Sequence, residues 1–309
     1  MSSSSSKNNK WPELNITEFA DTFDALHQFI QIVGKIRLNT MPWQNQSWHT
    51  TLYITSTGYS TNSIPYAGKI FQIDLNFQTH QLIIKCSGKA KSSMDLPGKT
   101  VADFYSELMA NLHHLGIQVQ IYAAPNEIAP AIPFDQNTTQ FNYDREAAFD
   151  LWQAMLRANE VFAQFRGEFL GKSSPVHLFW GGFDLAVTRF SGRAAPLWEG
   201  TLPPNMPLSV MQEAYSQEVS SAGFWPGSRE FPHPMFYAYA YPTPKEYATQ
   251  DILPDQASYS TDMGEFVLPY NEVQKAEDPN AMLLEFLRST YQAAASTANW
   301  DKGLVKKPD

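Results

Sequence analysis

The pattern of apolar and polar positions predicts a first half built as helix, strands and helix. Apolar residues recur every three to four positions over residues 16–38, with Asn15 or Thr17 as the cap. A second amphipathic stretch covers residues 100–116. Between and after these helices, apolar and polar residues alternate, as in strands with one buried face. The predicted strands cover residues 48–61, 69–77, 80–86 and 117–125.

The second half repeats this order after a stretch rich in Pro and Asn at residues 125–142. A long amphipathic helix over residues 144–169 precedes the strands, and Asp278 followed by Pro279 starts a closing helix. Strand patterns cover residues 174–193, 214–225, 235–242 and 265–270. We therefore predict an α+β fold of two similar, tightly associated halves, each an antiparallel sheet backed by helices. The expected parts are a disordered tail at 1–10, an N-terminal half at 11–140 and a C-terminal half at 141–309.

Both halves place a histidine at the start of the first strand that follows a long helix. His49 lies in "SWHTTLY" and His177 lies in "GKSSPVHLFW". An internal duplication would explain this correspondence and would equate the two histidines. The two sheets would then meet across a pseudo-twofold axis, and ligand sites often lie at such junctions.

The stretch "SPVHLFWGGFDLAVTRFSGR" at residues 174–193 holds polar residues inside the most apolar hairpin of the chain. Its Gly-Gly pair at 181–182 is typical of a two-residue turn with positive φ. Such a turn pairs Phe179 with Asp184 and His177 with Ala186. The alternation of side chains then separates a core face from a polar face. The polar face holds His177, Phe179, Asp184, Ala186 and Thr188.

This polar face predicts a small-molecule pocket in the C-terminal half. A carboxylate beside a histidine fixes the tautomer and raises the basicity of the ring, so His177 with Asp184 or Glu218 would perform acid–base catalysis. Arginine prefers planar anionic partners, and aromatic rings suit a flat apolar group, so we expect an anionic, partly aromatic ligand. The expected ligand-binding residues are His49, Arg189, Arg193, Trp225 and Tyr237.

Two alternatives of a different class remain open. The polar cluster could instead be structural, in a non-catalytic binding or scaffold protein whose two halves it locks together. Loss of turnover without loss of folding in His177→Ala would support the enzyme, and a large loss of stability would support the scaffold. The tyrosines of "FYAYAYP" could also form a protein-binding surface, while Ala238 and Ala240 leave room on the other face of that strand.

Composition narrows the class of protein. The 309 residues are 43% hydrophobic with a net charge of −9, which disfavours nonspecific binding to nucleic acid or anionic membranes. No apolar run reaches the ~18 residues of a membrane span, and no export signal begins the chain, so we expect a cytoplasmic protein. Cys86 is the only cysteine, so no disulfide can form within the chain. The histidines are scattered, so no metal-binding motif is present. A metal site from His49, His177, Asp184 and Glu218 would require the two halves to bring these residues together, and the sequence leaves the cofactor open.

Several long segments of the sequence are similar to those of a known family. They are "QIVGKIRL", "WHTTLY", "VADFY", "GKSSPVHLFWGGFDLAVTRFSGR", "YSQEVSSAGFWPG" and "FYAYAYP". From Trp11 to "TANWD" the chain resembles a bacterial family catalogued as domain of unknown function number 5996. The resemblance implies a single unit and supplies no activity, cofactor or catalytic residue. The family often has His-Glu where this chain has Gln217-Glu218, which weakens any role for a histidine at 217.

Overall fold

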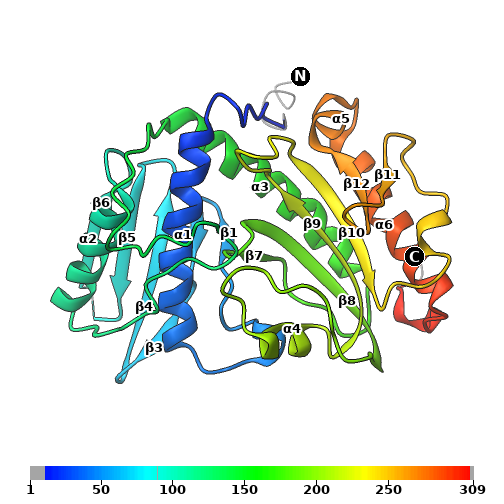
Figure 1. The fold of residues 1–309 in the computed structure, drawn as a ribbon, viewed down its shortest axis with the longest axis horizontal. Coiled ribbons are helices and arrows are strands. Elements are labelled where there is room, and N and C mark those ends of the chain that lie inside the picture. The colour runs from blue at the N-terminus through cyan, green and yellow to red at the C-terminus, as the bar shows by residue number, and fades with distance from the viewer. Residues whose placement is uncertain (1–10, 89, 307–309) are drawn as a thin grey trace, which may run out of the picture.

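The computed structural model describes residues 11–88 and 90–306 of the chain. Two antiparallel sheets lie side by side, and helices cover them (Figure 1). The predicted α+β class is therefore confirmed. The expected disordered tail at residues 1–10 lies outside the described residues.

The first sheet is formed by residues 53–95 and has the strand order β1-β2-β4-β5-β6, with β3 paired to β4. Helices α1 (Ala20–Thr40) and α2 (Val101–His114) contact each other and strands of this sheet, and α1 crosses in front of it in Figure 1. The strands are β1 (Tyr53–Thr55), β2 (Gly58–Ser60), β3 (Ile64–Tyr66), β4 (Lys69–Asn76), β5 (Gln81–Cys86) and β6 (Lys91–Asp95).

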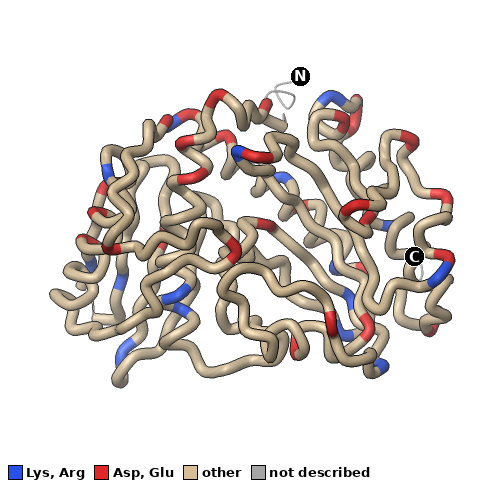
Figure 2. The backbone as a smooth tube through the Cα atoms, viewed as in Figure 1, with Lys and Arg blue, Asp and Glu red and all other residues tan. Residues whose placement is uncertain are grey.

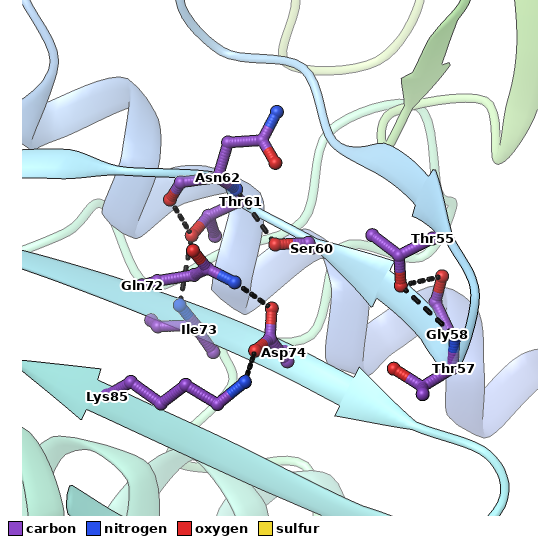
Figure 3. A network of polar contacts seen from close by, with 10 residues as sticks. All are labelled: Thr55, Thr57, Gly58, Ser60, Thr61, Asn62, Gln72, Ile73, Asp74 and Lys85. Carbon is purple, nitrogen blue, oxygen red and sulfur yellow. Dashed lines mark hydrogen bonds and ion pairs between the residues drawn. The ribbon is translucent and has the colours of Figure 1, made fainter.

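Polar side chains also form hydrogen bonds with one another and with the backbone along the first sheet (Figure 3). Asp74 accepts hydrogen bonds from Gln72 at 2.7 Å and from Lys85 of the neighbouring strand at 2.9 Å. The hydroxyl of Thr61 accepts from the backbone N–H of Ile73 at 3.0 Å, beyond the end of β2. These contacts pair polar groups on and beside the inner strands β4 and β5, so this sheet carries a polar network of its own.

The second sheet is formed by residues 177–269 in the order β11-β12-β10-β9-β8-β7. Its strands are β7 (His177–Phe179), β8 (Asp184–Ala194), β9 (Gln217–Trp225), β10 (Met235–Tyr241), β11 (Ser258–Ser260) and β12 (Glu265–Pro269). Helices α3 (Arg145–Gly167) and α6 (Pro279–Thr297) cover one face, with α5 (Tyr270–Lys275) beside them (Figure 1). The short helix α4 (Leu208–Ala214) lies over the other face. Short 3-10 turns are η1 (Asn45–Ser47), η2 (Tyr247–Thr249) and η3 (Lys302–Leu304).

The two sheets join where β1 and β7 approach each other. The backbones of Leu52 and Leu178 exchange two hydrogen bonds of 2.9 Å, so the sheets meet edge to edge. Trp11 ties the segment before α1 to the second half, since its indole donates to Asn280 at 3.0 Å and packs on Phe236. From this joint the first sheet runs β1-β2-β4-β5-β6 and the second runs β7-β8-β9-β10-β12-β11. The duplication itself stays a prediction.

Most predicted helix ends agree with the structure. Thr100 and Asp103 form a reciprocal capping box on α2, and Asp144 and Asp278 cap α3 and α6 through their side chains. Helix α1 instead begins at Ala20 without a side-chain cap. Residues 16–19 form a turn, because Asn15 accepts the N–H of Glu18 at 3.2 Å and starts that turn rather than the helix.

The predicted strand at residues 117–125 is wrong. Ile117 and Val119 are buried and their neighbours are exposed, so the alternation is present. No strand pairs with this segment in the described chain; the Tyr66 hydroxyl instead bonds both the N–H and the C=O of Gln118 at 2.9 Å. Alternation reports one buried face, whereas a strand also requires a partner ladder.

Acidic and basic residues are distributed over both halves rather than gathered in one basic stripe (Figure 2). Among residues 11–88 and 90–306, no helix combines the length and the apolar character needed to cross a membrane.

Candidate functional site

A cavity of about 730 Å³ lies on the face of the second sheet that α3 and α6 leave uncovered. Its floor consists of side chains of β8, β9 and β10, and its walls come from α1, the loop around residues 122–127 and α4. Both halves of the chain therefore build it, close to the joint between the sheets. A volume of this size is typical of sites for drug-sized ligands.

The hairpin of residues 177–194 supplies one end of this cavity. The predicted register is confirmed, with His177 opposite Ala186 and Phe179 opposite Asp184. The predicted two-residue turn is wrong: residues 180–183 form the turn, and Phe183, with φ 61°, takes the left-handed conformation. The glycine at 181 serves another purpose. A Cβ there would lie 1.9 Å from Oε1 of Glu127, so only glycine lets this carboxylate approach the turn.

Asp184 faces the cavity at the first position of β8. The hydroxyl of Tyr237 donates a hydrogen bond to its Oδ2. The Tyr237 ring crosses above Gly223 of the strand between them, where a Cβ would lie 2.3 Å from the phenol oxygen. Burial raises the pKa of Asp184 to about 6, although the bond from Tyr237 opposes this shift.

Two further carboxyl groups lie near Asp184. Burial, and then the charge of Asp184, raises the pKa of Glu127 and of Glu265 to about 7. The ideal Cβ position of Gly182 lies 3.2 Å from Oδ1 of Asp184 and 3.6 Å from Oε2 of Glu127, so these two groups converge on the turn. Neither Glu127 nor Glu265 has a side-chain hydrogen bond or ion pair within the described chain.

Helix α1 positions the loop that carries Glu127. The fully buried amide of Gln31 accepts the N–H of Asn126 at 3.0 Å and donates to its C=O at 2.7 Å. The same amide donates to the carbonyl of Gly181 at 3.1 Å, and His27 bonds that carbonyl at 2.7 Å. One polar group of the helix thus fixes the loop and the hairpin turn relative to each other.

Aromatic rings form much of the remaining wall. Tyr215 and Tyr239 share a hydrogen bond of 3.0 Å between their hydroxyls, and the Trp180 indole donates to the Thr50 carbonyl at 2.9 Å. Other lining rings are those of Trp48, Tyr122, Phe179 and Phe190. The tyrosine face of β10 therefore points into the cavity. The opposite face, with Ala238 and Ala240, is buried beneath α6, so the small residues make room for a helix rather than for a ligand.

His177 lies outside the cavity lining. Its ring is fully buried among Trp48, Tyr53 and Phe179, at centroid distances of 6.1, 5.5 and 5.7 Å. Neither ring nitrogen has a hydrogen-bond partner, so the expected pair with Asp184 does not form. Burial, helped by the charges of Arg37 and Arg166, lowers the pKa of His177 to about 3. The ring is neutral and sealed by aromatic neighbours.

Both expected arginines lie away from the cavity. Arg189 points to the helix-covered face, where it donates to the carbonyl of Phe165 and its guanidinium carbon lies 3.4 Å from the centre of that ring. Arg193 pairs with Glu218 at 2.6 Å and also donates to the Ala298 carbonyl at the end of α6. The structure therefore uses Arg189, Arg193 and Glu218 in contacts between sheet and helices.

Two other expected ligand-binding residues, His49 and Trp225, also lie away from the cavity. His49 is buried and accepts the N–H of Gln44 through Nδ1 at 3.2 Å, and burial lowers its pKa. Trp225 stacks on Phe231 at 5.7 Å. Neither side chain lines the cavity. Of the predicted set, Asp184 and Tyr237 alone both line the cavity and contact each other.

The family model for the Family of unknown function (DUF5996) matches residues 11–307. The chain belongs to this family. No curated protein and no solved structure matches it. Membership of DUF5996 assigns no activity to the chain, so the chemistry of the cavity has to be argued from the residues that line it.

Sequence reasoning missed two charged residues that line this cavity. Lys35 is a lysine in the middle of the apolar helix "QIVGKIRL", and a charge there is a signal that could have been used. Glu127 lies in the Pro- and Asn-rich stretch that reads as a connection, so nothing local distinguished it. Within the described chain, no group of three or more His, Cys, Asp or Glu side chains is arranged to hold a metal ion.

Proposed function

We propose that this chain binds a small cationic molecule, an amine with an apolar or aromatic body, in the cavity beside Asp184. The observation that carries the proposal is the group of three carboxyls, Glu127, Asp184 and Glu265, which have no basic partner in the described chain. Burial raises the pKa of all three, and the charge of Asp184 raises that of the other two further. Two of them, Glu127 and Asp184, line the cavity. A bound cation would favour their ionised forms and would offset part of the cost of burying them.

The aromatic lining supports the same class of ligand. A cation is attracted to the face of a Trp or Tyr ring, and the apolar part of the ligand gains from leaving water. The cavity presents such rings from both halves of the chain. The expectation of an anionic ligand rested on Arg189 and Arg193, and both lie in structural contacts outside the cavity. His177 has no role in this proposal, because its ring does not reach the cavity.

Calorimetric titration with benzylamine, and with benzyl alcohol as its neutral counterpart, tests the proposal. We expect benzylamine to bind at least about 10-fold more tightly at pH 8, the difference expected of one charge-assisted contact. Affinity should fall from pH 8 to pH 5, because Asp184 and Glu127 take up protons near pH 6 and 7 while the amine stays charged. Equal affinities for the two compounds, or no binding of either, would overturn the proposal in favour of the structural scaffold.

Two variants test whether the bound amine contacts Glu127. Gly181→Ala puts a methyl group where the Glu127 carboxylate lies, at a residue without a positive φ, and should weaken benzylamine binding about 10-fold without unfolding the chain. Glu218→Gln is the matched control, since this carboxylate belongs to the same sheet but pairs with Arg193 away from the cavity. Equal loss of affinity in both variants would show that the effect does not come from Glu127.

A further inference from the structure

Lys35 is the one basic residue that lines the cavity within the described chain, and its surroundings are unusual for a lysine. It lies in α1 between fully buried residues, and only 4% of its surface is exposed. A lysine is almost never buried this deeply unless it is paired. None of the ion pairs of the described chain includes it.

The contacts of the Lys35 ammonium group are neutral. Nζ donates a hydrogen bond to Oδ1 of Asn126. The centres of the Tyr122 and Trp180 rings lie 5.5 and 5.4 Å from Nζ. Burial therefore lowers the pKa of Lys35 to about 8, with no carboxylate to oppose the shift. An amine in such an apolar environment keeps a nucleophilic lone pair on part of its population near neutral pH.

A second lysine close by shows the difference. Lys172 also lies over aromatic rings, with Nζ 4.4 Å from the centre of Phe190. Its Nζ donates to the side-chain oxygens of Gln46 at 3.0 Å and Gln217 at 2.9 Å, and it does not line the cavity. Lys172 thus donates to two amide oxygens and does not itself line the cavity, whereas Lys35 donates to one amide oxygen and lines the cavity.

We propose that Lys35 is a reactive amine that condenses with the aldehyde or ketone carbonyl of a small molecule held in the cavity. The Nζ lone pair forms a C–N bond to the carbonyl carbon, and the carbonyl electron pair moves to oxygen, which takes up a proton. The nitrogen, now positively charged, loses a proton to give the neutral carbinolamine. Its hydroxyl then takes up a second proton and leaves as water, and the nitrogen loses its remaining proton to leave the imine. Glu127, adjacent in sequence to the Asn126 partner of Lys35, is the lining carboxyl that we assign as the proton donor.

This reaction uses the same cavity as the proposed amine site but does not depend on amine recognition. The test is reductive trapping: the full chain is incubated at pH 7 with benzaldehyde and cyanoborohydride, then digested and mapped by mass spectrometry. We expect Lys35 to acquire the benzyl group at least about 10-fold faster than Lys85, whose side chain is 59% exposed. Lys172 should react no faster than Lys85.

The wild-type chain supplies the decisive comparison, so no variant has to fold for the result to count. Labelling of Lys35 at or below the rate of Lys85 would overturn the proposal. Lys35→Arg keeps the positive charge and removes the nucleophile, so it should abolish the fast label while leaving the slow labels of exposed lysines unchanged. A fast label that persists elsewhere in Lys35→Arg would also overturn it. Because benzylamine titration is read separately, failure of the amine site and failure of the reactive lysine are distinguishable.

Discussion

The two faces of the second sheet treat buried charge in opposite ways. Strand β8 carries Asp184 on the cavity face and Arg189 on the face that α3 and α6 cover. Arg189 lies against Phe165, Tyr291 and Phe169, with its guanidinium carbon 3.4, 4.4 and 5.1 Å from the ring centres. Asp184 has one tyrosine partner and open volume beside it. A buried charge marks a ligand site only where the packing leaves space next to it.

The largest expected effect comes from removing the charge on the packed face. Arg189→Ala should lower the free energy of unfolding by about 3–5 kcal/mol, because it empties a closely packed site and leaves the Phe165 carbonyl without its donor. Urea denaturation measures this change, and benzylamine binding by the folded protein should be unaffected. Arg288→Ala removes an exposed ion pair with Glu168 and should cost under about 1 kcal/mol. Equal costs for the two variants would remove the distinction between the faces.

A charge on the cavity face should instead destabilise the protein as it ionises. Burial raises the pKa of Glu127 from 4.5 to about 7, so between these pH values the folded state binds more protons than the unfolded state. This contribution to stability is present at low pH and is lost as the pH rises through 7. Glu127→Gln removes this pH dependence. The free energy of unfolding of the variant, relative to that of wild type, should therefore rise by about 1–2 kcal/mol from pH 4 to pH 8, allowing for solvent screening.

Urea denaturation of wild type and of Glu127→Gln at pH 4 and pH 8 measures this change. The difference in unfolding free energy between the two proteins is compared at the two pH values. The buried histidines titrate identically in wild type and variant, so their opposite pH dependence cancels. A difference between Glu127→Gln and wild type that does not change with pH would mean that Glu127 is solvated in the folded protein.

The smallest effect is expected at His177, which lies on the cavity side of β7 but is sealed from the cavity by rings. His177→Leu removes two unpaired ring nitrogens from an apolar site, so at pH 7.5 stability should rise by up to about 1 kcal/mol. The stability of the variant relative to wild type should increase further below pH 6.5. There the histidine of the unfolded wild-type chain takes up a proton, whereas the folded ring, with its pKa near 3, stays neutral. Thermal melts at both pH values check this, and loss of benzylamine binding would contradict the assignment of His177 to the wall behind the site.

The candidate site shows where local pattern stops being informative. Alternation along β8 correctly placed Asp184 and Thr188 on one face, and the Gly-Gly signal correctly gave the strand register. The same alternation could not say that Ala238 faces a helix while Tyr237 faces a cavity, because both faces of a buried strand are covered by something. The partner of Asp184 comes from another strand, and its neighbour Glu127 comes from a connection with no periodicity at all.

The sequence by itself determined the fold class and most of the helices and strands, because amphipathic helices, alternating strands, a hairpin register and an acidic composition are local properties of the chain. Tertiary structure alone decided which charges meet. The pKa of Glu127 is raised because a loop held by Gln31 of α1 buries this carboxyl at the hairpin turn beside Asp184. Electrostatic coupling and burial depend on distance in space, and residues 35, 127, 184 and 237 become neighbours of one cavity only after both halves have folded.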